Sequence, residues 1–256
     1  MGSAMLIERV CVGDGRGFTV YSLGKGTKCI AIYSLGGTYH VCPSAALYAI
    51  IRELKEREPR FRLVLIPELF ERTAIDGVGE GISNYRDMVI DALSRYIEGC
   101  ELLLEVTGLE ECLPHVVAKS EELDFGIPIL VEEPRSEVLR KLSTVVGNVA
   151  QLRVSGGMSV PRSSVLKAIE ALRTILSSLA GSKGSERRVL RRASYVYSPY
   201  VGIFVPEVDV GADVVEGDVL GSIQDRKVKT PSEGTVLAIS RARLVDVGDF
   251  VALIAK

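Results

Sequence analysis

From residue 28 to residue 179, short β-branched runs alternate with stretches that carry apolar residues at helical spacing. This alternation constrains the fold more than any other feature of the sequence. Lys28–Ser34 and Arg62–Ile66 predict buried strands, and Ser44–Arg57 between them predicts an amphipathic helix. The other elements expected on the same grounds are strands at Glu101–Val106, Ile127–Val131 and Ala150–Val154 and helices at Arg86–Ile97 and Ser163–Leu179. The sequence therefore predicts an α/β fold, a mostly parallel or mixed sheet with helices on both faces.

After Tyr197 the sequence changes to short strands and repeats itself. Gly202–Val205 leads to Gly217–Ile223, and Gly234–Leu237 leads to Gly248–Ile254. Each half predicts a strand, a Gly-Asp turn and a second strand. Two such halves are expected to form a small all-β sandwich of the lipoyl/biotinyl type.

A stretch of different character separates these two patterns. Ala180–Arg192 is rich in Gly and Ser and then basic, as a linker would be. We therefore predict an α/β domain over residues 5–182 and a β-sandwich domain over residues 193–256. Residues 1–4 are interpreted as a remnant of cloning and left out of both.

The composition argues against several functional classes. Hydrophobic residues make up 47% of the chain, charged residues 25%, and the formal net charge is -2, so neither disorder nor nucleic-acid binding is indicated. No apolar run reaches the ~18 residues that span a membrane, and no secretion signal is visible, so we expect a cytoplasmic protein without a membrane partner. The scarcity of Asn and Gln beside many Arg and Glu suggests a heat-loving source.

The five cysteines are odd in number, widely spaced and mostly set among apolar residues: Cys11, Cys29, Cys42, Cys100 and Cys112. This pattern favours buried thiols over disulfides. It also favours a reducing compartment.

Several motifs in the last third carry a resemblance to a known family. They include Gly-Ile-Phe-Val-Pro from Gly202, the Gly-Asp pairs at Gly217 and Gly248, and Pro-x-x-Gly at Pro231–Gly234. This tail is similar to the C-terminal domain of the succinylglutamate desuccinylase/aspartoacylase family. The elements before it follow the order of that family's zinc-carboxypeptidase-like domain. The resemblance implies a zinc-dependent hydrolase of linear amide bonds.

The chain departs from that family where the chemistry would lie. The resemblance implies zinc held by a His-Gly-x-Glu loop and by the His of Asp-Leu-His, with a Glu on a later strand as general base. Here Gly37 stands for the first His, His40 for the Glu and Thr107 for the second His. Arg153, or Ser155, stands for the general base. The catalytic residues are therefore missing, and no cofactor is expected.

Three functions remain open, and the first is a non-catalytic protein that binds a small anionic or acyl-amino compound, or a protein partner. A guanidinium recognises a carboxylate through two parallel hydrogen bonds, so arginines near the site are natural anion contacts. The residues expected to bind the ligand are His40, Arg86, Glu105, Thr107 and Arg153.

The second function is an active metal-dependent amidohydrolase with relocated zinc ligands. His40 with Cys42, and Cys112 with His115, have spacings that suit zinc. The simpler interpretation is that the two cysteines are small buried hydrophobes and the histidines lie on loops. The third function is an interaction or scaffold protein that docks through its β-domain.

Two further signals have simple explanations. Lys227 precedes Pro231 by only four residues, which is too short for the hairpin that displays a lipoyl or biotin lysine. The linker arginines are interpreted as solvated charges: Arg187, Arg188, Arg191 and Arg192.

Overall fold

A large mixed sheet forms the centre of the N-terminal region. The computed structural model describes residues 5–12, 16–36, 40–56, 59–70, 81–157, 160–182 and 188–256. For residues 81–83 it describes the backbone alone. Within these residues the sheet has the order β1-β2-β4-β3-β5-β9-β7-β8-β10. Its strands are β1 (Leu6–Cys11), β2 (Gly17–Leu23), β3 (Cys29–Ser34), β4 (Arg62–Ile66), β5 (Leu102–Leu109), β7 (His115–Ala118), β8 (Ile129–Val131), β9 (Asn148–Ser155) and β10 (Val189–Leu190).

The middle of this sheet is parallel and its flanks are mixed. β4, β3, β5 and β9 run parallel, as the strand and helix alternation predicts. The β1–β2 hairpin joins antiparallel at one side, and β7 pairs antiparallel with β9 at the other. The prediction of an α/β fold with a mixed sheet is confirmed. The sequence interpretation gave no bounds for β1, β2, β7 and β10, and β10 lies within the stretch predicted to be a linker.

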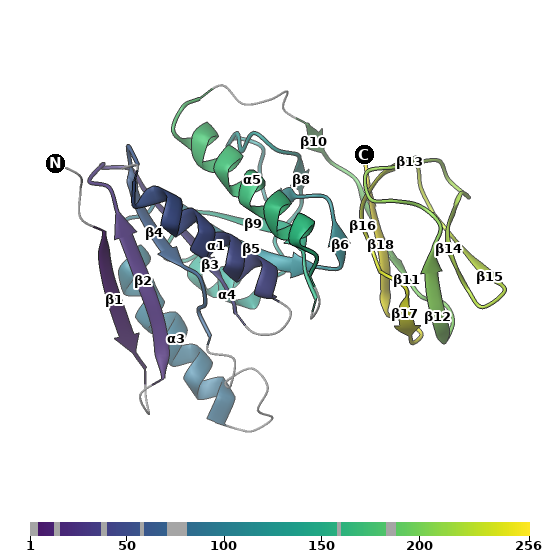
Figure 1. Cartoon of the computed structure of the whole chain (residues 1–256), viewed down its shortest axis with the longest axis horizontal. Helices are drawn as coiled ribbons and strands as arrows, with labels where there is room; N and C mark the ends of the chain where they lie inside the picture. The colour runs from purple at the N-terminus through teal and green to yellow at the C-terminus, as the bar shows by residue number, and fades with distance from the viewer. Residues whose placement is uncertain are drawn as a thin grey trace.

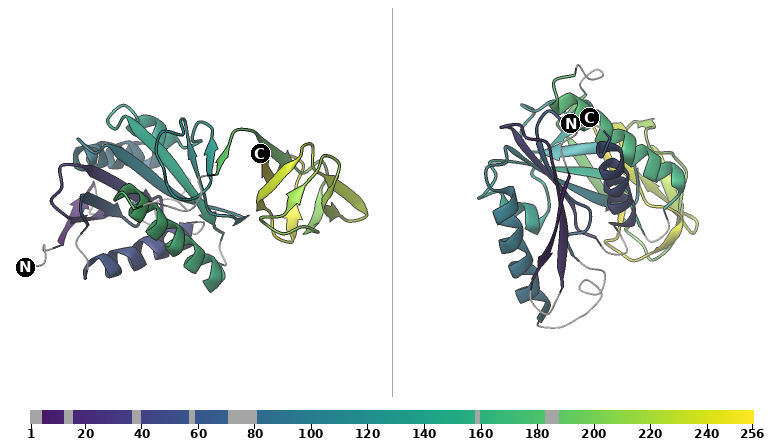
Figure 2. Two further views of the ribbon diagram at one scale, coloured as in Figure 1. Left: turned by 90° about the horizontal axis from the view of Figure 1, so that it is seen from above. Right: turned by 60° about the vertical axis from the view of Figure 1, so that its left-hand side comes forward.

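Helices cover both faces of the sheet (Figure 1). α1 (Val41–Leu54) and α5 (Arg162–Leu179) pack against one face, where Leu47, Ile50 and Leu172 meet the even-numbered residues of β3 and β5. α3 (Gly81–Ile97) and α4 (Glu137–Leu142) pack against the other. Seen from above, α1 and α5 lie on the side of the sheet opposite α3 (Figure 2). No helix among the described residues is long and apolar enough to cross a membrane.

The C-terminal region contains two antiparallel sheets around a small apolar core (Figure 1). One sheet has the order β11-β18-β16-β13 and the other β15-β14-β12-β17. Their strands are β11 (Ala193–Tyr197), β12 (Gly202–Pro206), β13 (Asp213–Val214), β14 (Val219–Ile223), β15 (Arg226–Lys229), β16 (Gly234–Ile239), β17 (Arg243–Val245) and β18 (Phe250–Ala255). Each predicted half of the repeat supplies strands to both sheets.

The sequence repeat is also a repeat of hydrogen bonds. In the first Gly-Asp turn the carboxylate of Asp218 accepts from the amide of Val215 at 2.9 Å. In the second, Asp249 accepts from the amide of Asp246 at 3.0 Å. Because each Asp closes its own turn, both turns hold the same shape.

A second repeated motif precedes each half. The hydroxyl of Ser198 donates to the carbonyl of Tyr200 at 2.5 Å, and that of Thr230 donates to the carbonyl of Ser232 at 2.6 Å. Each motif continues as Pro-x-x-Gly, and Gly202 and Gly234 both have φ of 151°. The sequence interpretation recognised only the second Pro-x-x-Gly.

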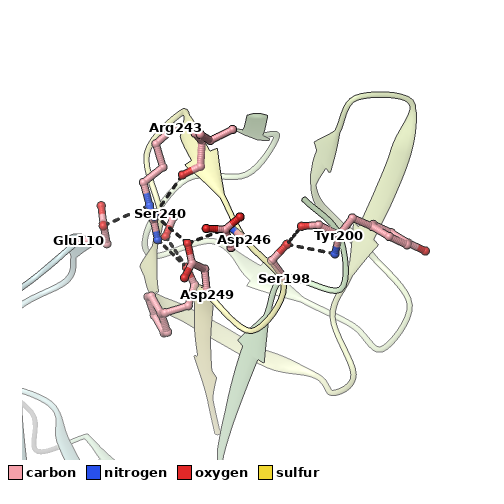
Figure 3. A network of polar contacts seen from close by, with 9 residues as sticks. Glu110, Ser198, Tyr200, Ser240, Arg243, Asp246 and Asp249 are labelled. Atoms are coloured by element: carbon pink, nitrogen blue, oxygen red, sulfur yellow. Dashed lines mark hydrogen bonds and ion pairs between the residues drawn. The ribbon is translucent and has the colours of Figure 1, made fainter. Parts of the chain in front are cut away.

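The two regions meet through a strand pair and an ion pair. β6 (Glu111–Cys112) leaves the end of β5 and pairs antiparallel with β16, so it extends the C-terminal sheet. Arg243 binds Asp249 within the C-terminal region at 3.3 Å, and its Nε lies 3.4 Å from Glu110 of the N-terminal region (Figure 3). Apolar residues from both regions bury one another at this junction, Cys112, Val117, Leu130, Leu237 and Leu253 among them.

The cysteines correct one expectation from the sequence. Cys29 and Cys100 form a disulfide, although they are separated by 71 residues. They meet because β3 and β5 run parallel side by side, and the amide of Glu101 donates to the carbonyl of Cys29. The spacing of the cysteines along the sequence did not show that these two residues are neighbours in the sheet. Cys11, Cys42 and Cys112 are free thiols.

Candidate functional site

The two faces of the central strands differ in chemistry. On the face covered by α1 and α5, side chains such as Leu104 and Leu152 are apolar to the end of the strand. On the other face, β9 carries three buried polar residues at alternate positions, Gln151, Arg153 and Ser155. Alternation of side chains across a strand places these three on one side of the sheet. The polar residues therefore gather at the carboxyl ends of β5 and β9, where open α/β sheets bind ligands.

Strand register arranges these polar residues in two rows. In the first row, Tyr33 of β3 lies opposite Glu105 of β5, which lies opposite Gln151 of β9. In the second row, Thr107 lies opposite Arg153. His115 of β7 lies on the other side of Arg153. Residues opposite each other in a sheet lie on the same face, so each row is a line of neighbouring side chains.

Glu105 is the centre of the first row and is only 1% exposed. Its carboxylate accepts from Tyr33 Oη at 2.6 Å, from Ser136 Oγ at 2.7 Å and from Gln151 Nε2 at 2.7 Å. Burial raises the pKa of Tyr33 well above its ordinary value, so its phenol stays a donor. Ser136 is also the N-cap of α4, because its Oγ accepts from the amide of Leu139.

Arg153 is the centre of the second row and is only 6% exposed. Its Nε donates to Gln151 Oε1 at 3.1 Å, and its Nη1 donates to the hydroxyl of Tyr195 at 3.1 Å. No carboxylate of the described residues lies within ion-pair distance of this guanidinium. A buried cation held by two neutral groups is unusual, because burying a charge is costly unless an anion accompanies it.

Tyr195 belongs to β11 and joins the site to the C-terminal region. Its hydroxyl donates to Glu132 Oε2 at 2.6 Å while accepting from Arg153. Arg135 binds the same Glu132 carboxylate at 2.9 Å. Its guanidinium carbon also lies 4.2 Å from the centre of the Tyr195 ring. One continuous polar network thus runs from Tyr33 to Arg135.

The other residues expected at the site lie around this network. His40 precedes α1, and its Nδ1 accepts from the amide of Gly108 at 3.3 Å, while burial lowers its pKa. Thr107 is half-buried beside Arg153. Arg86 instead makes an ion pair with Glu137 at 2.9 Å, between α3 and α4. Gly37 lies outside the described residues.

Solved structures share the overall fold of this chain. An aspartoacylase family protein from Mesorhizobium loti matches with a TM-score of 0.75 and 19% identity, over 100% of this chain and 95% of that one. This chain has the aspartoacylase-type fold. A succinylglutamate desuccinylase/aspartoacylase from Rhodobacter sphaeroides matches with a TM-score of 0.74 and 14% identity, over 100% and 95%. The product-bound ectoine utilization protein EutE from Ruegeria pomeroyi matches with a TM-score of 0.70 and 15% identity, over 100% and 96%.

These matches cover the full chain, so the aspartoacylase-type fold includes the C-terminal sheets. No family model and no curated protein matches the sequence.

Zinc does not fit the residues that this chain places at the expected positions. The Nδ1 of His40 already accepts a backbone hydrogen bond, and Thr107 offers a neutral hydroxyl, which is a weak zinc donor. Arg153 brings a permanent positive charge into the same row. A divalent cation needs anionic or imidazole donors, and the residues at the two expected strand positions are a neutral hydroxyl and a cation.

The residues considered as relocated zinc ligands are hydrogen-bonded or protonated. His115 is fully buried, and its Nδ1 donates to the carbonyl of Leu113 at 2.8 Å and lies 3.7 Å from Cys112 Sγ. Burial raises the pKa of Cys112 to about 12 and that of Cys42 to about 11, so both stay thiols rather than thiolates at neutral pH. The described residues, which include these three and His40, contain no group of three His, Cys, Asp or Glu side chains placed to hold a metal.

Sequence reasoning named Glu105, Thr107 and Arg153 but missed the residues that bind them. Three of these are uncharged side chains from separate elements: Tyr33, Gln151 and Tyr195. The i, i+2 pair of Gln151 and Arg153 at the end of a strand was the one signal available, since alternation puts both on the same face.

Proposed function

We propose that this chain is a divergent member of the succinylglutamate desuccinylase/aspartoacylase family that binds a small carboxylate-bearing ligand and does not hydrolyse it. The proposal includes two domains, over residues 5–182 and 193–256, with the second a lipoyl/biotinyl-like barrel-sandwich. It also includes a location in the cytoplasm and a small anion, such as an acyl-amino acid, as the bound ligand. The aspartoacylase-type fold and the composition support these points together.

The buried guanidinium of Arg153 is the observation that carries this proposal. Its Nε and Nη1 donate to Gln151 and Tyr195, and its Nη2 has no hydrogen-bond partner among the residues that the structure describes. A carboxylate that reached Nη1 and Nη2 would satisfy these donors and supply the missing negative charge. Thr107 beside it offers a hydroxyl to the same ligand.

Loss of hydrolysis follows from the same residues. The zinc ion of such hydrolases lowers the pKa of a bound water, and a nearby carboxylate takes the proton. With Thr107 and Arg153 at the expected positions, this chain supplies neither an adequate ligand set nor a base there. Arg153 would attract the negative end of an acyl-amino acid but could not activate water, because a guanidinium stays protonated.

The test compares binding with turnover. We expect N-acetyl-L-aspartate or N-succinyl-L-glutamate to bind in isothermal titration calorimetry, and neither to be hydrolysed with zinc present. R153Q should lose tenfold or more in affinity, because a charge-assisted bidentate contact is replaced by a neutral one. R173Q is the matched control, since Arg173 is an exposed arginine of α5 paired with Glu53. Zinc-dependent turnover abolished by a chelator would refute the proposal.

A hydrolase with relocated ligands is the alternative that the proximity of Cys112 and His115 supports. Metal analysis of protein purified without added zinc separates the two functions. Near-stoichiometric zinc that is lost in H115A would favour the hydrolase. An expectation of zinc-free protein follows from the buried, protonated thiol of Cys112.

A scaffold function is supported by the outer face of the β15-β14-β12-β17 sheet. Ile203 and Leu244 lie opposite each other there and are 58% and 68% exposed. Exposed apolar neighbours of this kind can mark an interaction surface. A pull-down that retains a partner with the native chain and loses it with I203S would support this function.

A further inference from the structure

We propose that Tyr195 is a positioning residue for Arg153, so that the C-terminal sheet forms part of the anion-binding site. This inference rests on the proposed function, because it assigns a role in that same site. It also goes beyond it, because no sequence pattern pointed to a site residue from the C-terminal region. Tyr195 lies in β11, and it reaches Arg153 of β9 across the junction between the two regions.

The hydroxyl of Tyr195 can orient Arg153 because its own proton is already committed. The hydroxyl donates that proton to Glu132 Oε2 at 2.6 Å. Its oxygen therefore keeps its lone pairs for a donor, and Arg153 Nη1 lies 3.1 Å away.

The ring that carries this hydroxyl is itself held on several sides. Arg135 lies over one face of the ring and binds the same Glu132 carboxylate that the hydroxyl reaches. β11 pairs with β18, which places Tyr195 opposite Leu253. Leu253 is fully buried in the apolar junction between the regions. The position of the hydroxyl is therefore set by how the C-terminal sheet packs.

Two anchors fix a guanidinium where one does not. Gln151 holds Nε, and Gln151 is fixed in turn because its Nε2 donates to Glu105. Tyr195 accepts from Nη1, so two hydrogen bonds fix the orientation of the guanidinium plane. Without the second hydrogen bond, Arg153 would have to be ordered by the ligand, and that ordering weakens binding.

The first measurement is the affinity for N-acetyl-L-aspartate by isothermal titration calorimetry. Y195F keeps the ring and its contact with Arg135 but removes the acceptor, so we expect about fivefold to tenfold weaker binding. E132Q keeps an oxygen for the tyrosine proton, and we expect a change of about twofold or less. Y200F is the control, because Tyr200 lies in the same region and its ring contacts Arg226, which does not belong to the network. It should bind as the native chain does.

The second measurement does not depend on a ligand. The Nε–H of Arg153 should give an NMR signal protected from solvent exchange, and Y195F should exchange faster by tenfold or more while Y200F does not. If the native chain binds no anion, the proposed function fails, and the exchange rate still decides whether Tyr195 orients Arg153. Native affinity and native exchange in Y195F would overturn the inference. So would equal losses in Y195F and Y200F.

Discussion

The two faces of the central sheet share the same strands but serve different purposes. Under α1 and α5 every buried side chain of β5 and β9 is apolar, whereas under α4 and the C-terminal sheet the same strands turn polar halfway along. Neighbouring residues in one strand therefore belong to different faces, as Leu152 and Arg153 do. One face can be devoted to stability and the other to binding, because side-chain alternation separates them.

The largest expected effect is on the apolar face. L152A removes a side chain that is fully buried between the sheet and its helices. We expect a loss of about 3 to 5 kcal/mol in the free energy of unfolding, from lost burial and the cavity left behind. Urea denaturation measures it. If the division is correct, the folded variant binds N-acetyl-L-aspartate with native affinity.

The disulfide lies on the other face, in the apolar core under α3 and α4. Its loss is expected to lower the free energy of unfolding somewhat less than L152A does. Reducing the bond between Cys29 and Cys100 should lower the free energy of unfolding by about 2 to 4 kcal/mol, because it releases a long loop in the unfolded chain. Urea denaturation with and without a reductant measures the change. C100S is the control, since the reductant should not affect it further. An unchanged midpoint in the native chain would show that the bond does not form.

His115 should make the polar face sensitive to acid. Burial lowers its pKa from 6.5 to about 4, so the folded state keeps it neutral while the unfolded state binds a proton. The stability that the neutral His115 contributes is therefore fully present above pH 6.5 and is lost as the pH falls toward 4. Between pH 7 and pH 5 we expect a loss of about 2 kcal/mol from this residue. H115F should show a smaller loss over the same range in urea denaturation. An equal loss would assign the effect to other groups.

The smallest effect on stability is expected at Arg153. R153Q removes a buried cation that has no carboxylate partner among the described residues, so no opposite charge is left unpaired. We expect a change of about 1 kcal/mol or less in the free energy of unfolding, beside the large loss of affinity described above. Urea denaturation of R153Q and L152A in parallel gives the contrast between adjacent residues. A greater destabilisation by R153Q would end the distinction between the two faces.

Much of the fold could be predicted from local patterns. β4 runs over the predicted residues, and β3 and α5 begin within one residue of the prediction, because β-branched runs and helical periodicity act locally. β1 is an exposed edge strand without an apolar face, so periodicity gave no signal for it. The disulfide escaped for a related reason, since the contact of Cys29 with Cys100 depends on which strands are neighbours.

The site was predictable in its charges but not in its connections. Arg153 and Glu105 stood out as charged residues at the ends of apolar strands. That Gln151 lies between them follows from strand register, which no local pattern encodes. Tyr195 comes from a region with its own repeat and its own core, and its contact with Arg153 depends on how two sheets pack. Long-range packing decides such contacts.

The pairing of β6 with β16 has a consequence for how such chains can be recombined. A fragment that ends before residue 188 would keep β6 but lose the strand that satisfies its backbone, and would expose Cys112 and Leu130 to water. A C-terminal fragment would carry the matching defect along β16. The boundary between exchangeable modules therefore does not coincide with the linker. A C-terminal region grafted from a relative should bring its own copy of β6 with it.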